Sequence, residues 1–243
     1  MPCSEKRARK LLERKEAKPY WFKGIFCIIL QREPKTRYQQ KICIGIDPGS
    51  KMSGLTILSE KHTLLNVQYN APTHVKGRVE DRALIRHIRR QNNTPYRKCR
   101  FNRSVRDERV PPSTLSRWRQ HLNLIKHFSK LYKITDVAFE DIKARAVKGA
   151  KKWNKTFSPL QGGKNWFYIQ VEKSYNLHIY QGFDTYRIRV EKGLKKGTDK
   201  KKVSFESHCV DSWTIANDVL RGIDKPENER LIHLKPLIYY RRK

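Results

Sequence analysis

Three acidic residues, Asp47, Glu140 and Asp211, occupy positions from which they could share metal ions. The first two each end an apolar, β-prone run, and the third lies early in a predicted helix. Because carboxylates held close together repel one another, such a set is tolerated when cations lie between them. Oxygen ligands suit Mg²⁺ and Mn²⁺, and two such ions about 3.5 to 4 Å apart can activate an attacking water and stabilise the leaving oxygen of a phosphodiester. The residue types therefore predict metal-dependent cleavage of a nucleic-acid strand.

These assignments have competing interpretations. Asp47 begins the turn Asp-Pro-Gly-Ser, and an Asp in a turn often hydrogen-bonds its own backbone. Asp141 directly follows Glu140 and could be the ligand in its place. His208 stands three residues before Asp211, a spacing that puts both on one face of a helix. A histidine whose hydrogen bonds are satisfied within its helix is the alternative.

The elements predicted around these acids follow a specific order. Three β-prone runs come first, and helices and strands then alternate, which gives the order β-β-β-α-β-α-β-α. With an acid at the end of the first and fourth strands and early in the last helix, this order matches the RNase H-like nuclease fold, an α/β fold whose mixed sheet is flanked by helices. The predicted strands are 42–46, 55–58, 63–69, 134–140 and 177–180, and the predicted helices are 113–132, 164–175, 184–194 and 205–221.

The residues before the first of these strands predict a separate small unit. Glu5–Glu16 can form a short basic helix, which needs a partner surface because a helix of this length is marginal alone. Trp21–Leu30 predicts a single strand, and Gln31–Gln40 predicts a polar linker.

The charge of the chain indicates its partner. It carries 54 Lys and Arg against 23 Asp and Glu, a formal net charge of +31 in 243 residues. Self-repulsion of this size is tolerated when a polyanion neutralises it, and nucleic acid is the commonest such partner. A membrane surface is the competing partner, but the sequence has no apolar run of about 18 residues. The composition favours a nucleic-acid-binding protein without a membrane segment.

Positive charge is dense in the segment 74–112. Its first arginines recur at helical spacing, and its few acids do not offset them. Tyr96 and Phe101 stand among these cations and could stack on unpaired bases or act as local packing anchors. The arginines predicted to contact nucleic acid are Arg78, Arg82, Arg86, Arg89, Arg90, Arg97, Arg100 and Arg103.

The cysteines exclude two kinds of site. Five are scattered singly without a C-x-x-C pair, so neither a zinc ribbon nor a disulfide framework is indicated, and a reducing compartment is expected. They are Cys3, Cys27, Cys43, Cys99 and Cys209.

Several of these stretches resemble one known family. IGIDPGSKMSGLTIL resembles the first RuvC motif, VAFED the second and HCVDS the third, as found in IscB and IsrB, the transposon-encoded ancestors of RNA-guided CRISPR nucleases. MPCSEKRARKLL is similar to the start of the family's N-terminal PLMP domain, and His74–Arg109 takes the place of its arginine-rich bridge segment. The resemblance extends over nearly the whole chain.

The resemblance implies roles for particular residues. Asp47, Glu140 and Asp211 would be metal-binding catalytic acids and His208 a metal ligand or proton donor, with Mg²⁺ or Mn²⁺ as cofactor. The arginine-rich segment would bind a structured guide RNA and its heteroduplex with target DNA by shape, while base pairing reads the sequence. The interval Asp141–His208 is too short for an HNH domain, which implies the IsrB type that cuts one strand.

The expected protein is a monomer in a ribonucleoprotein, in the cytoplasm or nucleoid of a prokaryote or in a plastid stroma, and is not secreted. Two alternatives stay open. One is a catalytically inactive binder of structured RNA on the same fold, and the other is a Holliday-junction resolvase, which shares the acids but does not account for the arginine-rich segment. The expected segments are a PLMP-like N-terminal segment (1–40), a first RuvC-like part (41–73), the arginine-rich bridge (74–112), the remaining RuvC-like parts (113–223) and a short basic tail (224–243).

Overall fold

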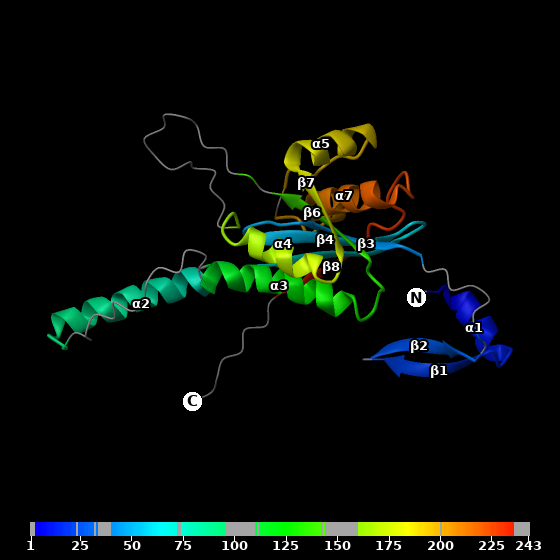
Figure 1. Cartoon of the computed structure of the whole chain (residues 1–243), viewed down its shortest axis with the longest axis horizontal. Helices are drawn as coiled ribbons and strands as arrows, with labels where there is room; N and C mark the ends of the chain where they lie inside the picture. The colour runs from blue at the N-terminus through cyan, green and yellow to red at the C-terminus, as the bar shows by residue number, and fades with distance from the viewer. Residues whose placement is uncertain are drawn as a thin grey trace.

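A computed structural model describes residues 3–22, 24–31, 33, 40–71, 74–95, 110, 112–141, 143, 160–199 and 201–235. A small N-terminal unit, a central sheet and a long arginine-rich helix are visible in Figure 1. The helices are α1 (Glu5–Glu13), α2 (His74–Gln91), α3 (Pro112–Phe128), α4 (Lys164–Glu172), α5 (Gly182–Glu191), α6 (Phe205–His208) and α7 (Val210–Leu220). The strands are β1 (Ala17–Phe22), β2 (Ile25–Leu30), β3 (Ile42–Asp47), β4 (Met52–Ser59), β5 (Thr63–Asn70), β6 (Asp136–Asp141), β7 (Asn176–Gln181) and β8 (Leu231–Leu234).

The central sheet has the strand order β7-β6-β3-β4-β5-β8. The first three strands of this sheet, β3, β4 and β5, form an antiparallel meander, while β6 pairs parallel to β3 and β7 pairs parallel to β6. The order of strands and helices along the chain is the one predicted from the sequence, and the RNase H-like fold is confirmed. Strand β3 lies in the middle and is buried on both faces, which explains its continuous apolar run.

Helices cover both faces of the sheet, and side-chain alternation along β3 decides which residue meets which layer (Figure 1). Ile42, Ile44 and Ile46 pack in one core with buried residues of α3 and α4. Cys43 packs in a second core with α6 and α7. Because Asp47 shares the parity of Cys43, its side chain belongs to the α7 side of the sheet.

Two glycines let the end of α6 and the start of α7 lie directly on the sheet. A Cβ atom on Gly45 would overlap the backbone carbonyl of Ser212, and one on Gly54 would overlap the backbone carbonyl of His208. Gly45 is in β3 and Gly54 in the neighbouring strand β4, where it pairs with Asp47. The absence of both side chains therefore sets how deeply the start of α7, which carries Asp211, is seated.

We expect Gly54→Ala to lower the free energy of unfolding by about 1 to 3 kcal/mol, because the added methyl group must push the end of α6, and with it the start of α7, away from the sheet. The matched control is Gly77→Ala in α2, where an added Cβ meets nothing within 4 Å. That change should stabilise the helix by about 0.5 to 1 kcal/mol. Denaturant unfolding of both variants measures the difference, and equal effects would contradict the seating role of Gly54.

Two sequence-based predictions are wrong in detail. The single strand over Trp21–Leu30 is instead part of an antiparallel hairpin, β1 and β2, and Gly24 between them has a φ of 82°. Glycine adopts that left-handed conformation without strain, so the chain can reverse there. The single helix over 205–221 is instead α6 and α7, because Cys209 has a φ of −113°, far from the helical value of about −63°.

The segment interpreted as a basic tail contains a strand that the sequence analysis missed. β8 pairs parallel to β5 at the edge of the sheet. At four residues, it is too short for its pattern to stand out from a loop. Among the helices that the structure describes, none is long and apolar enough to cross a membrane.

Candidate metal centre

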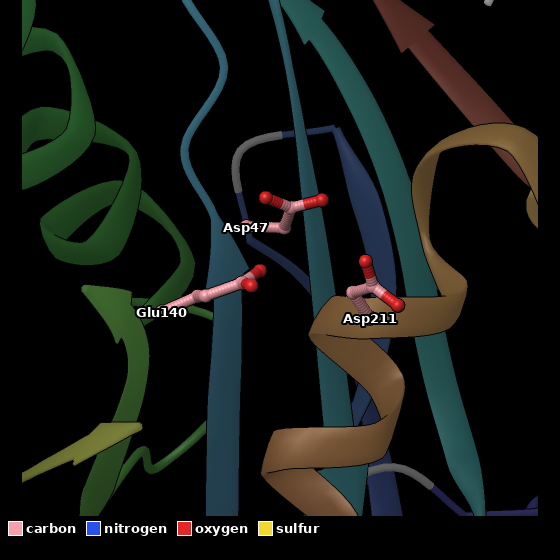
Figure 2. Close-up of side chains that lie close together, drawn as sticks. All are labelled: Asp47, Glu140 and Asp211. Atoms are coloured by element: carbon pink, nitrogen blue, oxygen red, sulfur yellow. The ribbon is translucent and has the colours of Figure 1, made fainter. Parts of the chain in front are cut away.

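The three predicted acids meet at one point of the fold. Figure 2 shows the carboxylates of Asp47, Glu140 and Asp211 directed toward one another from β3, β6 and α7. One carboxylate oxygen from each lies within 4.8 Å of the other two. Residues separated by more than 160 positions in the chain thus share a site small enough for one or two cations.

Strand register and helix packing create this meeting point. β3 and β6 are parallel neighbours in which Ile46 lies beside Phe139, so the next residues, Asp47 and Glu140, also lie side by side. Asp211 lies in the first turn of α7, which the two glycines seat on β3 and β4.

Strand alternation separates Glu140 from its rival Asp141. The side chain of Asp141 is buried on the opposite face of β6, where it accepts hydrogen bonds from Lys164 Nζ at 2.7 Å and from Tyr168 Oη at 3.0 Å. Both partners belong to α4. Among the described residues, Glu140 is therefore the acid of this pair that joins the other two carboxylates.

The turn after Asp47 is closed by another side chain. The Ser53 hydroxyl accepts a hydrogen bond from the Gly49 backbone N–H at 3.0 Å and lies 3.3 Å from the Gly49 carbonyl, to which it can donate. With the turn held in this way, the carboxylate of Asp47 projects toward Glu140 and Asp211 (Figure 2).

Two cationic side chains that the sequence analysis did not assign to the site contact these acids. Lys196 Nζ lies 3.6 Å from Asp47 Oδ2 and also bonds Asp211 Oδ2. Arg189 Nη1 donates to Asp211 Oδ1 at 2.5 Å. Lys196 comes from the loop between α5 and α6, and Arg189 comes from α5. Many cations occur in both, so no sequence signal distinguished these two from solvated neighbours.

The electrostatics of the site favour an added cation. Burial raises the pKa of Asp47, and the charge of Asp211 raises it further against the opposing effect of Lys196. Burial and the charges of Asp47 and Asp211 raise the pKa of Glu140 to about 9. Burial alone would lower the pKa of Lys196, but the two aspartates outweigh it and raise that pKa.

The residues fit a divalent metal. All three donors are carboxylate oxygens, the ligand type that Mg²⁺ and Mn²⁺ prefer. The ammonium of Lys196 already lies against two of the three acids, which shows that the site accommodates positive charge.

The raised pKa of Glu140 predicts a pH dependence of stability in metal-free protein. Between pH 4.5, the ordinary pKa of a glutamate, and about pH 9, Glu140 keeps its proton in the folded state and loses it in the unfolded state. The contribution of Glu140 to the free energy of unfolding therefore falls as pH rises through that window. We expect Glu140→Gln to become progressively more stable than the unmutated protein from pH 5 to pH 9 in chelator. Thermal melts at several pH values measure this, and parallel curves for the two proteins would contradict it.

His208 lies next to the site without joining the group of acids. It ends α6, and its side chain is buried. Because the chain departs from helical geometry at Cys209, the three-residue spacing to Asp211 does not carry both side chains along one helix. Among the described residues, the convergent ligand atoms come from the three acids alone, and the role of His208 stays a prediction.

The arginine-rich segment begins as predicted with a helix. α2 is solvent-exposed from Gly77 to Gln91 and extends away from the central sheet in Figure 1. It carries Arg78, Arg82, Arg86, Arg89 and Arg90. The predicted contacts Arg97, Arg100 and Arg103, like Tyr96 and Phe101, lie outside the described residues.

Comparisons with known proteins give one family and several structures. The solved structures similar to this chain include "T. thermophilus RuvC in complex with Holliday junction substrate", with 13% identity over 72% of this chain and 90% of that chain and a TM-score of 0.40. They also include "Thermus thermophilus RuvC structure", with 11% identity over 74% of this chain and 97% of that chain and a TM-score of 0.37. No curated protein matches the chain. The family model described as RRXRR protein matches residues 1–152, more than half of the sequence, so the chain belongs to the RRXRR family.

Proposed function

We propose that this RRXRR protein is an RNA-guided, metal-dependent DNA endonuclease of the IscB/IsrB group that nicks one strand. The observation that carries the proposal is the convergence of Asp47, Glu140 and Asp211 within 4.8 Å on an RNase H-like sheet. Burial and the neighbouring carboxylates raise the pKa values of Asp47 and Glu140, and such perturbed acids are typical of functional sites.

The chain's own residues would prepare the phosphodiester for hydrolysis. Divalent ions bound here would supply activation of water and stabilisation of the leaving oxygen. The three carboxylates fix where those ions lie, and the packing of α7 on Gly45 and Gly54 fixes the separation of the carboxylates. Lys196 can pair with a phosphate oxygen that approaches the acids, because its ammonium already contacts Asp47 and Asp211.

The surface of α2 supports the guide-binding part of the proposal. Five arginines lie on one exposed helix, and the chain as a whole carries a net charge of +31. Such a helix attracts a nucleic-acid backbone whatever its sequence, which suits recognition by shape while base pairing supplies specificity. One group of acids provides one cleavage site, so a single strand would be cut.

A specific observation favours the inactive RNA binder as second candidate. Asp211 contacts both Arg189 and Lys196, and Asp47 contacts Lys196, so the chain neutralises part of the acidic charge by itself. A fold that balances its own acids could persist without metal or catalysis.

The experiment that separates the two candidates uses the protein with the RNA that co-purifies with it. The complex is incubated with supercoiled DNA carrying a match to that RNA and randomised flanking sequence, with Mg²⁺, Mn²⁺ or chelator. We expect nicked circles with either ion and none with chelator. Intact DNA under every condition would favour the inactive binder, and cutting of a four-way junction without RNA would favour the resolvase.

A further inference from the structure

Helix α5 presents an exposed apolar face beside the acids. Phe183, Tyr186 and Val190 recur at helical spacing, and they are 69%, 55% and 55% exposed. The opposite side of the helix is anchored, since Thr185 and Ile188 are buried. Two aromatic rings exposed to water on a helix whose other side is anchored to the fold indicate a surface that meets a partner.

This helix is connected to the acids at two points. A Cβ atom on Gly182, the residue before Phe183, would lie 3.3 Å from Glu140 Oε1. Arg189 donates to Asp211, and its guanidinium carbon lies 5.4 Å from the centre of the Tyr186 ring. Helix α5 therefore adjoins the acids, with Phe183 next to the residue near Glu140 and the Tyr186 ring beside the arginine that contacts Asp211.

The charges around the rings identify the chemistry of the partner. Residues 182–196 contain five cations, Arg187, Arg189, Lys192, Lys195 and Lys196, against two acids, Asp184 and Glu191. Asp184 accepts from the Gln181 backbone in the capping box at the start of α5, and Glu191 lies 3.9 Å from Arg187. Aromatic faces among excess cations match a nucleic-acid strand, whose bases stack while its phosphates pair with the cations.

We propose that Phe183 and Tyr186 form a stacking platform for unpaired bases of the strand to be cut, close to the phosphate that reaches the acids. The inference rests on the proposed nuclease function and adds which side chains orient the strand. A ring needs no particular base for stacking, so the platform would hold the strand without selecting its sequence.

Binding of two short oligonucleotides tests the platform apart from cleavage. The probes are a 12-nucleotide thymidine strand and an abasic strand with the same number of phosphates, in an Asp47→Asn background that prevents cutting. Phe183→Leu with Tyr186→Leu keeps the apolar bulk and removes both rings. We expect this change to weaken thymidine-strand binding about tenfold or more and to leave abasic-strand binding unchanged.

The matched control is Ile169→Ala on α4, which removes an apolar side chain that is 55% exposed on another helix. It should change neither affinity. A second readout is photo-crosslinking with a strand that contains 5-iododeoxyuridine, and we expect the crosslinked peptides to include Phe183 or Tyr186.

Three binding or crosslinking results would overturn the platform: the double variant loses equal affinity for both strands, it loses affinity for neither, or the crosslinks are confined to peptides outside 182–196. A change of molar mass in the double variant would also overturn it, because the apolar face would then serve self-association. A protein that nicks no DNA yet shows the expected base-dependent binding would refute the proposed nuclease function and leave the stacking surface in place.

Discussion

Asp47→Asn should abolish strand cleavage and at the same time raise the melting temperature of the metal-free protein. The loss of rate should be on the order of 10³-fold or more, since removal of one member of a cooperating catalytic group removes most of the group's effect. The gain in stability follows from the geometry, because Asp47 lies within 4.8 Å of two other acids and burial disfavours its charged form. Nicking of supercoiled DNA and thermal melts in chelator measure the two effects.

Metal dependence sharpens this test. Mg²⁺ should raise the melting temperature of the unmutated protein, because an ion that binds only the folded state stabilises it, and should have little effect on the Asp47→Asn variant. RNA affinity should change little, since a carboxylate adds nothing to the attraction for a polyanion. If the Asp47→Asn variant still cleaved DNA and still showed the rise in melting temperature with Mg²⁺, Asp47 would be excluded from the site.

Asp141→Asn is the matched control, because Asp141 adjoins Glu140 in the chain and lies on the other face of β6. It should destabilise the fold by weakening the contact with Lys164, yet retain cleavage by the molecules that remain folded. If Asp141→Asn abolished cleavage while Glu140→Gln did not, the second catalytic acid would be Asp141.

Strand patterns in the sequence were sufficient to predict the centre of the fold. The alternation of Ile42, Ile44 and Ile46 and the carboxylates that follow β-prone runs predicted the meander and the first two acids, because strand periodicity and strand ends are local properties. The choice between Glu140 and Asp141 needed the structure, since only the assembled sheet shows which face α7 covers.

Other features depended on long-range packing or on single backbone angles. The hairpin of β1 and β2 turns next to one glycine with a φ of 82°, and the division of α6 from α7 depends on the backbone at Cys209. The contacts of Lys196 with Asp47 and Asp211 join residues far apart in the chain. None of these features has a periodic signal, which explains why the sequence analysis missed them.

Replacing Arg82, Arg86 and Arg89 together with Gln should reduce RNA affinity on the order of 10²-fold at about 0.1 M salt. Each phosphate contact contributes about 0.7 to 0.9 of a decade in affinity for each decade of salt, so the slope of log affinity against log salt should fall by about 2 to 3. All three side chains lie on α2, and all three residues are exposed, so they can reach a backbone without a rearrangement of the fold. The probe is the RNA that co-purifies with the protein, titrated across a range of salt concentrations.

The matched control removes the same charge from a different helix. Arg119 and Lys126 lie in α3 and Lys130 lies two residues beyond its end. All three are exposed, and their replacement with Gln lowers the net charge by the same three units. If attraction depended only on total charge, both triple variants would lose affinity equally. We expect the slope of the α2 variant to fall by about 2 to 3 and the slope of the α3 variant to change little, because contacts that release counterions are local. Equal slopes in the two variants would show that α2 is not the principal RNA-binding surface, and the guide-binding part of the proposed function would then be wrong.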